Sequence, residues 1–517
     1  MTDLTPPAPL SGAERGEPGS IGAGFRLTTP SGSNRNLPPF LPSPSEGGGV
    51  GEGASRGWMM RAALAVVVFA VSFGVFSERA TRVGYNTDEG QAIWPAQYFQ
   101  FVFLEGRVSG PVWEPSYWTL TQVPVYRYII GAGIWLGGAQ FMELDLDHRR
   151  DEVSGPDRAK YFDPETYRDE RKLAEQRRIP RPAPDVLWAA RVPMVLLGAG
   201  TVALLFVVAA ELAGVLAGLV TAVTFTAAPF VLTLLPRAHT EAPFLFFLVL
   251  GLWLSMRAAR AARQGKSALV IGALAGAAVG LSAGSKLTGV LALAALGAFA
   301  AGAFALAVVA RRRAVADEVG PRSVLDGSWK WAALAAVLGL VVFLAVDPFL
   351  WRDPVGRTRA MLAFRQQEMF GQRTLNEDLA VPEGVATRLV FLLRRSALDE
   401  PWAASRLGVP IEGVLMVVGA GMLTTRVWRA RRAGGLIGPE AVLGSWLLMM
   451  VLGTAPNLGI DWDRYYLPIV ALGLICAGVG TAWLVDGARR IVSRRRAPTT
   501  TAATPPPMPT ASSGSAG

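Results

Sequence analysis

Long apolar segments separated by short polar ones dominate the pattern of residues along this chain. Most of the segments are about 18–25 residues long, which is the length of helix that spans the ~30 Å hydrocarbon core of a bilayer. The pattern therefore predicts an all-α, polytopic transmembrane helical bundle of about 10–11 spans, with amphipathic helices and loops on the extracytoplasmic side. The apolar segments lie at roughly 58–77, 186–210, 214–236, 242–256, 268–285, 287–310, 329–350, 406–425, 439–460 and 465–485.

One further apolar stretch, YRYIIGAGIWLGGAQF at 126–141, admits two placements. At about 16 residues it is short for a span. If it lies flat on the membrane, four basic clusters fall on the same side as Arg56, whereas a span would put them opposite the N-terminus. Lys and Arg accumulate in cytoplasmic loops, so we predict the flat placement and cytoplasmic termini. The clusters are Arg257–Lys266, Arg311–Arg313, Arg426–Arg432 and Arg489–Arg496.

This topology predicts one membrane domain at 57–490 with two long outer loops, at 78–185 and 351–405. The first loop contains a strongly charged stretch of mixed sign at 145–182, which we interpret as a solvated insert. Segments rich in Pro, Gly, Ser and Thr flank the membrane domain and cannot bury enough apolar surface to fold. We therefore predict disordered tails, at 1–56 on the cytoplasmic side and at 497–517.

Composition supports the membrane class and excludes several others. The chain is 51% hydrophobic and 17% charged, whereas soluble proteins carry about 25% charged residues. The net charge is +10, but the basic residues lie in short clusters between apolar segments, so we expect no nucleic-acid partner. The single cysteine, Cys476, lies in an apolar segment, which excludes a disulfide framework and a cysteine-based metal site.

An acidic pair, Asp88 and Glu89, follows directly after the first apolar segment. Carboxylates are costly to hold near lipid, so this pair is a candidate functional site. A carboxylate at a membrane-facing cleft can act as a general base on a hydroxyl group or can hold a divalent cation. The structural alternative is a helix cap, in which Asn86, Thr87 or Asp88 caps the helix that follows.

Further charged and aromatic side chains fall on the same predicted face of the membrane. Each has a plain alternative: Lys286 could extend to the interface, Arg464 could pair with Asp461 or Asp463, and Arg191 could anchor its helix at the interface. Glu241 could cap a helix, and Arg237 could be an ordinary boundary residue. The candidates are Tyr126, Arg127, Arg237, His239, Glu241, Lys286, Arg464 and Tyr465.

The order of these motifs over most of 58–485 resembles the GT-C superfamily of membrane glycosyltransferases. The pattern is most similar to the branch with protein O-mannosyltransferases and the bacterial aminoarabinose lipid A transferase. The chain departs from that branch at TQVPVY, where a double proline or Lys-Pro is common, and in the insert at 145–182. After the acidic pair, the motifs are TQVPVYRY, RVPMVLLGAGTVALL, RAHTEAPFLFFLVLGLWL, GLSAGSKLTGVLAL and RYYLPIVALGL.

The resemblance implies transfer of a sugar from a polyprenyl-phosphate donor to a hydroxyl on a lipid, glycan or protein. Asp88 matches the position of the family's base, which implies inversion at the anomeric carbon, and Glu89 would position the base or the acceptor. The leaving phosphate needs cationic stabilisation in a dry site. The candidates for that contact are Lys286, Arg464, Arg127 and Arg237, and those for other substrate contacts are Glu241, His239, Tyr126 and Tyr465.

The implied site is extracytoplasmic, in a multi-pass protein that we expect in the bacterial inner membrane among membrane lipids. A divalent metal stays open, but with only two histidines in the chain we expect no cofactor. The alternatives are a transporter or flippase of lipid-linked sugars, a non-catalytic membrane scaffold, and another enzyme such as a lipid phosphotransferase. A transporter would place its charges near the bilayer midplane, in a cavity open alternately to both sides.

Overall fold

The computed structural model describes residues 52–144, 181–316, 328–401, 406–432 and 438–496. Within these ranges it contains no β-strand, and one isolated bridge joins Ala380 and Ile460. The predicted all-α class is therefore confirmed. The predicted tails and the insert at 145–182 lie outside the described residues, apart from a few at their edges.

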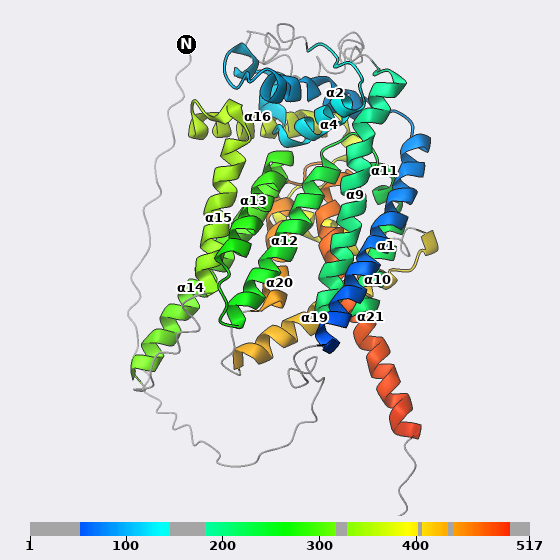
Figure 1. Cartoon of the computed structure of the whole chain (residues 1–517), viewed down its shortest axis with the longest axis vertical. Coiled ribbons are helices and arrows are strands. Elements are labelled where there is room, and N and C mark those ends of the chain that lie inside the picture. Colours follow the sequence, from blue (N-terminus) through cyan, green and yellow to red (C-terminus); the bar gives the residue numbers. More distant parts are fainter. Residues whose placement is uncertain (1–51, 145–180, 317–327, 402–405, 433–437, 497–517) are drawn as a thin grey trace, which may run out of the picture. The chain divides into compact units, whose positions relative to one another are not determined.

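Long helices form the body of the molecule and run side by side (Figure 1). Every predicted apolar segment lies on helical structure. Pro229 divides the segment at 214–236 into two helices, because proline has no N–H to continue a helix. The helices are α1 (Glu52–Arg82), α9 (Pro184–Ala213), α10 (Val215–Ala227), α11 (Pro229–Leu234), α12 (Glu241–Arg263), α13 (Leu269–Ser285), α14 (Val290–Ala316), α15 (Ser328–Ala345), α19 (Ile411–Arg432), α20 (Pro439–Thr454) and α21 (Leu467–Arg496).

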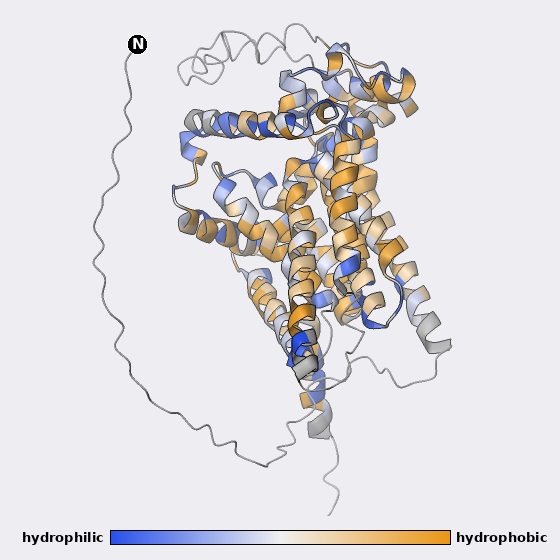
Figure 2. Ribbon diagram, turned by 90° about the vertical axis from the view of Figure 1, so that its left-hand side faces the viewer, coloured by the Kyte–Doolittle hydropathy of each residue, from blue (hydrophilic) through white to orange (hydrophobic). Residues whose placement is uncertain are grey.

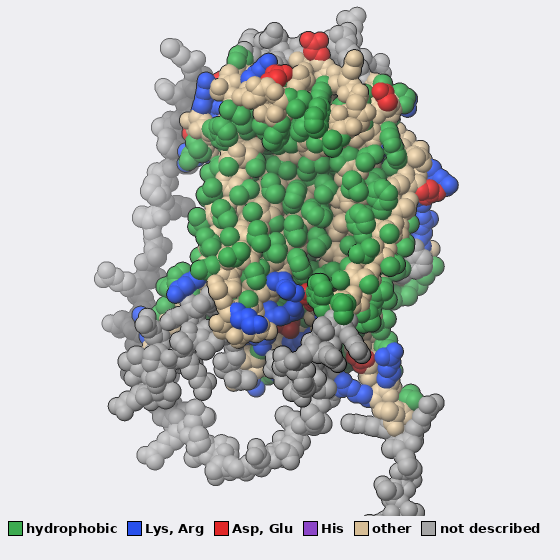
Figure 3. Space-filling view, viewed as in Figure 1, with side chains coloured by type: hydrophobic (Ala, Val, Ile, Leu, Met, Phe, Trp, Pro, Cys, Tyr) green, Lys and Arg blue, Asp and Glu red, His purple; other side chains and the backbone are tan. Residues whose placement is uncertain are grey.

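Among the described residues, 6 helices are long and apolar enough to cross a membrane, and shorter apolar helices accompany them. The predicted multi-pass membrane protein is confirmed, although length alone identifies fewer spans than the sequence pattern. Figure 2 shows the apolar character of the long helices, and Figure 3 shows an apolar band across the face of the bundle that it presents. The long spans are Gly57–Arg82, Pro184–Ala213, Glu241–Arg263, Leu287–Val309, Ile411–Arg432 and Leu467–Ser493.

Short helices lie across one end of the bundle, which we call the outer end (Figure 1). They include α2 (Thr87–Ile93), α4 (Val125–Leu136) and α16 (Pro354–Leu375). Helix α4 has 12 residues, which extend over about 18 Å and cannot span a bilayer. Its position agrees with the flat placement predicted for 126–141. The Lys and Arg side chains below the apolar band in Figure 3 mark the opposite end, which we call the basic end.

Two central helices organise the interior of the bundle. Helix α13 packs between α12 and α15, and α21 packs against α9, α10 and α19. Both α13 and α21 end or begin at the outer end, where Lys286 follows α13 and Arg464 precedes α21. The packing of the bundle therefore brings both cations to the outer end.

Candidate active site

The acidic pair begins a short helix with a complete cap. The Asn86 side chain accepts a hydrogen bond from the Asp88 N–H at 3.0 Å, and Glu89 Oε2 accepts one from the Asn86 N–H at 3.2 Å. This capping box satisfies backbone donors that would otherwise have no partner at the start of α2. The cap alternative is confirmed, with Asn86 as the cap. The Asp88 side chain takes no part in this cap and is left for other contacts.

Glu89 is fully buried and serves as an anchor for three parts of the chain. Arg191 of α9 donates from Nε to Glu89 Oε1 at 2.8 Å and from Nη2 to Oε2 at 2.6 Å. The Ala238 N–H also donates to Oε1, at 3.0 Å. With these partners in place, the buried charge of Glu89 is paired and its oxygens are hydrogen-bonded. The carboxylate therefore holds α2 against α9 and the turn before α12.

Arg191 also caps the end of α1. Its Nη1 donates to the carbonyl oxygens of Ala80 at 2.6 Å and Val83 at 3.0 Å. These carbonyls lie in and just after the last turn of α1, where backbone acceptors lack helical partners. Arg191 is buried, so the interpretation of this residue as an interfacial anchor is wrong.

Asp88 lies beside two cationic groups and has a side chain that is 41% exposed. Its Oδ2 accepts a hydrogen bond from Arg464 Nη1 at 3.1 Å and lies 3.6 Å from His239 Nε2. His239 Nδ1 contacts Glu241, whose Oε1 accepts from Lys286 Nζ at 3.0 Å. Asp88, His239, Glu241 and Lys286 thus form a continuous chain of alternating charge, which we call the charged chain.

The surroundings shift the pKa values of Asp88 and His239 in opposite directions. Burial raises the pKa of Asp88, but the neighbouring His239 and the charge of Arg464 outweigh it and hold the pKa below its usual value. Burial lowers the pKa of His239, but the contact with Glu241 and the charges of Glu241 and Asp88 raise it to about 9. In this state Asp88 is therefore a carboxylate and His239 an imidazolium.

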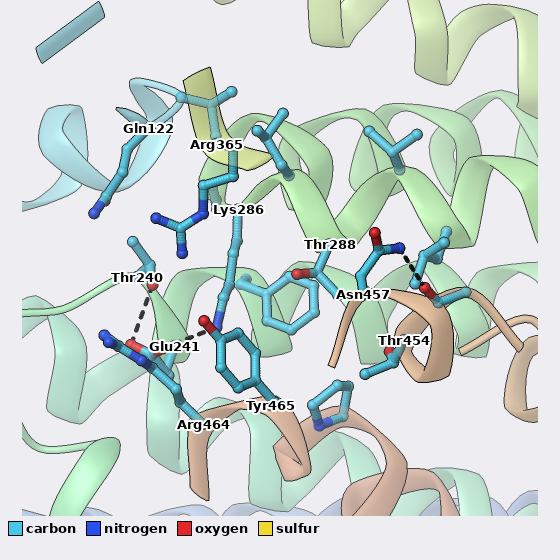
Figure 4. A pocket seen from close by; sticks show the side chains of 18 of the residues that line it. Gln122, Thr240, Glu241, Lys286, Thr288, Arg365, Thr454, Asn457, Arg464 and Tyr465 are labelled. Atoms are coloured by element: carbon cyan, nitrogen blue, oxygen red, sulfur yellow. Dashed lines mark hydrogen bonds and ion pairs between the residues drawn. The ribbon is translucent and has the colours of Figure 1, made fainter. Parts of the chain in front are cut away.

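A cavity of about 320 Å³ opens beside the charged chain (Figure 4). Three residues that line it, Gln122, Thr454 and Tyr465, each carry a buried side-chain oxygen without a hydrogen-bond partner among the described residues. Such atoms favour a polar ligand, because buried polar groups are nearly always paired. The polar lining consists of Thr121, Gln122, His239, Thr240, Glu241, Ser285, Lys286, Thr288, Arg365, Gln366, Thr454, Asn457, Arg464 and Tyr465.

Cations gather in one part of the cavity. Figure 4 shows Lys286 and Arg464 beside Glu241, with Arg365 of α16 on the same side. The remaining lining is largely apolar and comes from α12, α14, α16 and α21 and from the segments that follow α13 and α20. It consists mainly of Phe244, Leu287, Val290, Leu291, Leu362, Met369, Leu458 and Pro468.

The structure brings five of the predicted binding residues to this cavity: Lys286, Arg464, Glu241, His239 and Tyr465. The alternative partners of Arg464 are wrong, because Asp461 and Asp463 both pair with Arg395. Lys286 does not extend to the interface, since it pairs with the buried Glu241.

Five predicted residues do not line the cavity. Two of them are the acidic pair: Glu89 is buried, and Asp88 lies next to the cavity through Arg464 and His239. The other three are Arg127, Tyr126 and Arg237. Arg127 is buried, and its Nε donates to the Tyr126 hydroxyl at 2.9 Å. Arg237 lies in the turn before α12 and is half-buried. For Arg127, Tyr126 and Arg237 the structure gives no contact with the cavity, so we leave them out of the substrate contacts considered below.

Sequence reasoning missed Arg365, Thr454 and Asn457. Arg365 lies on an amphipathic helix of the second outer loop, and its nearest signal was the sequence FRQQ within that loop. Thr454 ends α20, so it was counted inside an apolar segment. A metal-free site stays a prediction, and the described residues contain no cluster of three or more His, Cys, Asp or Glu side chains that could hold a metal ion.

Comparisons with known proteins give one family match and several similar solved structures. Residues 183–349 match the family model of dolichyl-phosphate-mannose-protein mannosyltransferases, and no curated protein matches the chain. ArnT from Cupriavidus metallidurans bound to undecaprenyl phosphate is 17% identical, with a TM-score of 0.40, and the match covers 85% of this chain and 64% of that one. An oligosaccharyltransferase from Archaeoglobus fulgidus tethered to an acceptor peptide is 13% identical, with a TM-score of 0.48 and coverage of 83% and 50%.

A second structure from the same archaeon, the oligosaccharyltransferase AglB in complex with an inhibitory peptide and a dolichol-phosphate, is 12% identical with a TM-score of 0.43. It is matched over 87% of this chain and 53% of its own. The chain thus spans about half to two thirds of the length of the solved structures it matches. The match over 183–349 confirms, for that part of the chain, the predicted resemblance to the protein mannosyltransferases.

Proposed function

We propose that this protein is an integral-membrane glycosyltransferase. It moves a sugar from a polyprenyl-phosphate donor to a hydroxyl acceptor at the outer end, with Asp88 as the general base. The observation that carries the proposal is the contact of the partly exposed Asp88 carboxylate with Arg464, a cation that also lines the cavity. A base and a phosphate-binding group side by side are what transfer from a sugar phosphate requires.

Lys286, Arg365 and Arg464 are the proposed contacts of the donor phosphate. Arginine can bind two phosphate oxygens with its planar fork, and lysine acts as a point charge. The apolar lining from α14 and α21 suits a prenyl chain. Two of the similar structures contain undecaprenyl phosphate and dolichol-phosphate, which supports a lipid phosphate as the donor class.

The proposed reaction is a single displacement with inversion. The acceptor oxygen attacks the anomeric carbon as its proton passes to a carboxylate oxygen of Asp88. The bond between the anomeric carbon and the phosphate oxygen breaks, and its electron pair leaves with the prenyl phosphate. Cations that hold the leaving phosphate lower the barrier, because they stabilise the negative charge that develops there.

Glu89 acts as a positioning residue in this proposal. Its oxygens are occupied by Arg191 and by backbone N–H groups, so it has no place for a substrate contact. The buried, paired Glu241 holds Lys286 and His239 in place. Thr454 and Tyr465 offer their unpaired oxygens to hydroxyl groups of the sugar.

A transporter or flippase is the alternative that the geometry disfavours. Transporters place their charges near the midplane of the bilayer. Here Glu241 is the first residue of α12 and Lys286 follows the last residue of α13, both at the outer end. The charged chain therefore lies at a membrane boundary.

The test is transfer from radiolabelled polyprenyl-phosphate hexoses, supplied one at a time to the full-length protein in lipid nanodiscs. We expect Asp88→Asn to lower the rate by at least about 100-fold, the lower range for loss of a general base. Asp185→Asn, an exposed aspartate at the start of α9, is the matched control and keeps the wild-type rate. Wild-type transfer by Asp88→Asn would rule out Asp88 as the base, and no transfer from any donor by the wild type would end the proposal.

A further inference from the structure

Arg464 stands between the proposed base and the cavity. It lies on the short helix η10 (Asp463–Tyr465) just before α21, and its guanidinium packs 4.1 Å from the centre of the Trp462 ring. A guanidinium has five N–H donors, and only the one to Asp88 has an acceptor among the described residues. Because Arg464 also lines the cavity, its remaining donors are available to a ligand there.

A phosphate in the cavity would compete with Asp88 for this guanidinium. Phosphate offers the bidentate geometry that arginine prefers, whereas Asp88 takes a single hydrogen bond at 3.1 Å. The Asp88 side chain is partly exposed, so water can replace Arg464 as its partner at modest cost. Lys286 and Arg365 lie on the same side of the cavity, where they would hold a phosphate within reach of Arg464.

We propose that Arg464 is a phosphate-responsive switch on Asp88: an anionic group entering the cavity draws the guanidinium away and frees the carboxylate for the acceptor hydroxyl. The inference rests on the proposed function and adds regulation to the same site. Its consequence is an ordered reaction, in which the base gains strength only after the donor is bound.

The electrostatics of the ligand-free state support this order. A carboxylate whose pKa is held below its usual value accepts a proton poorly, and Arg464 is one of the groups that lower it. When Arg464 leaves, His239 remains beside Asp88, so the carboxylate stays oriented. The other charged or titratable groups that face Asp88 are Glu241 on α12, Glu89 and Tyr85 on its own segment, Lys286 beyond Glu241, and Arg181 over the Tyr85 ring.

The experiment measures the protonation of Asp88 without requiring turnover. The full-length protein in nanodiscs is treated with a water-soluble carbodiimide and an amine, which together modify protonated carboxyl groups, and Asp88 labelling is followed by peptide mass spectrometry against pH. Farnesyl phosphate is the probe, and farnesol, which lacks the phosphate, is its control. We expect farnesyl phosphate to raise Asp88 labelling at a fixed acidic pH by at least about tenfold, the equivalent of one pKa unit, and farnesol to leave it unchanged.

Variants separate the switch from a general effect of charge. Without any ligand, Arg464→Gln should already show raised labelling of Asp88. The Asp88 labelling of Arg464→Lys should be intermediate between that of Arg464→Gln and that of the wild type. Arg365→Gln, which removes a cation of the same cavity that has no contact with Asp88, should leave ligand-free labelling unchanged.

An unchanged pH midpoint in wild-type protein with farnesyl phosphate bound would overturn the switch, and so would wild-type labelling in ligand-free Arg464→Gln. Sugar transfer could persist in either case. A shifted midpoint together with failure to transfer any polyprenyl-phosphate sugar would leave the switch standing and remove the proposed function.

Discussion

Asp88 and Glu89 are neighbours in sequence with different surroundings. Glu89 is fully buried in a paired network, whereas Asp88 is partly exposed beside the cavity. At the scale of the residue, the two carboxylates therefore have different roles: Glu89 stabilises the fold, and Asp88 is the proposed catalytic base.

We expect Glu89→Gln to destabilise the protein by about 3–5 kcal/mol, because it leaves the buried Arg191 without its counter-ion. Asp88→Asn, which alters a partly exposed side chain, should change the unfolding temperature little. Thermal unfolding of both variants in the same detergent, followed by tryptophan fluorescence, is the measurement. Equal unfolding temperatures for the two variants would contradict this division of roles.

Asp347 makes stability depend on pH. It follows α15 and is buried, and burial raises its pKa to about 7 although the Phe349 N–H and the charges of Arg127 and Arg357 lower it. The folded state thus holds a proton that the unfolded state releases near pH 4. Stability is therefore greatest below that pH and falls as pH rises towards 7.

Asp347→Asn keeps an acceptor for the Phe349 N–H and removes the ionisation. At pH 8 we expect the free energy of unfolding of the variant to exceed that of the wild type by more than about 1.4 kcal/mol, the equivalent of one pKa unit. At pH 4 the two free energies should be equal. Denaturant unfolding at the two pH values tests this, and curves that differ equally at both would refute it.

At the scale of the element, α13 and α15 depend on a row of glycines. A Cβ on Gly276 would lie 2.4 Å from the Ala335 carbonyl oxygen, and one on Gly280 would lie 2.5 Å from that of Gly339. Small residues at such spacing let two membrane helices approach closely, which is where their packing energy arises.

We expect Gly276→Leu to force α15 away from α13 and to lower the unfolding temperature by several degrees, since overpacking costs about 1–3 kcal/mol. Gly297→Leu on α14 is the matched control, because nothing lies within 4 Å of its Cβ position. Thermal unfolding compares the two, and an equal loss in both would show that the close contact is not the cause.

Much of the fold was predictable because membrane-length apolar segments can only be helices with a few possible placements. The contacts of Arg191 were not, since sequence shows that an arginine begins a helix but not that α1 ends beside it. Arg365 was missed because the polar sequence of α16 was interpreted as part of the second outer loop. The order of the apolar segments placed Asp88, His239, Lys286 and Arg464 on one membrane face. The sequence did not show that the packing of α12, α13 and α21 forms a cavity there.

At the scale of the whole molecule, the distribution of charge predicts the orientation in the membrane: the basic end faces the cytoplasm and the outer end faces away from it. We expect Val355→Cys on α16, an exposed position, to react with a membrane-impermeant maleimide in intact cells. Arg431→Cys near the end of α19 should react only after permeabilisation, because basic ends face the cytoplasm. The native Cys476 is buried and supplies little background. Reaction of both positions from outside would overturn the predicted topology.

Arg191 has one further consequence. A single guanidinium fastens the end of α1, the carboxylate next to the proposed base, and the helix that carries the arginine itself. Replacing Glu89 or Arg191 alone leaves an unpaired charge in the interior. Any mutational path that replaces them one at a time therefore passes through a destabilised protein. Positions 89 and 191 should therefore covary in related sequences, so that both members of the pair are kept or both are replaced.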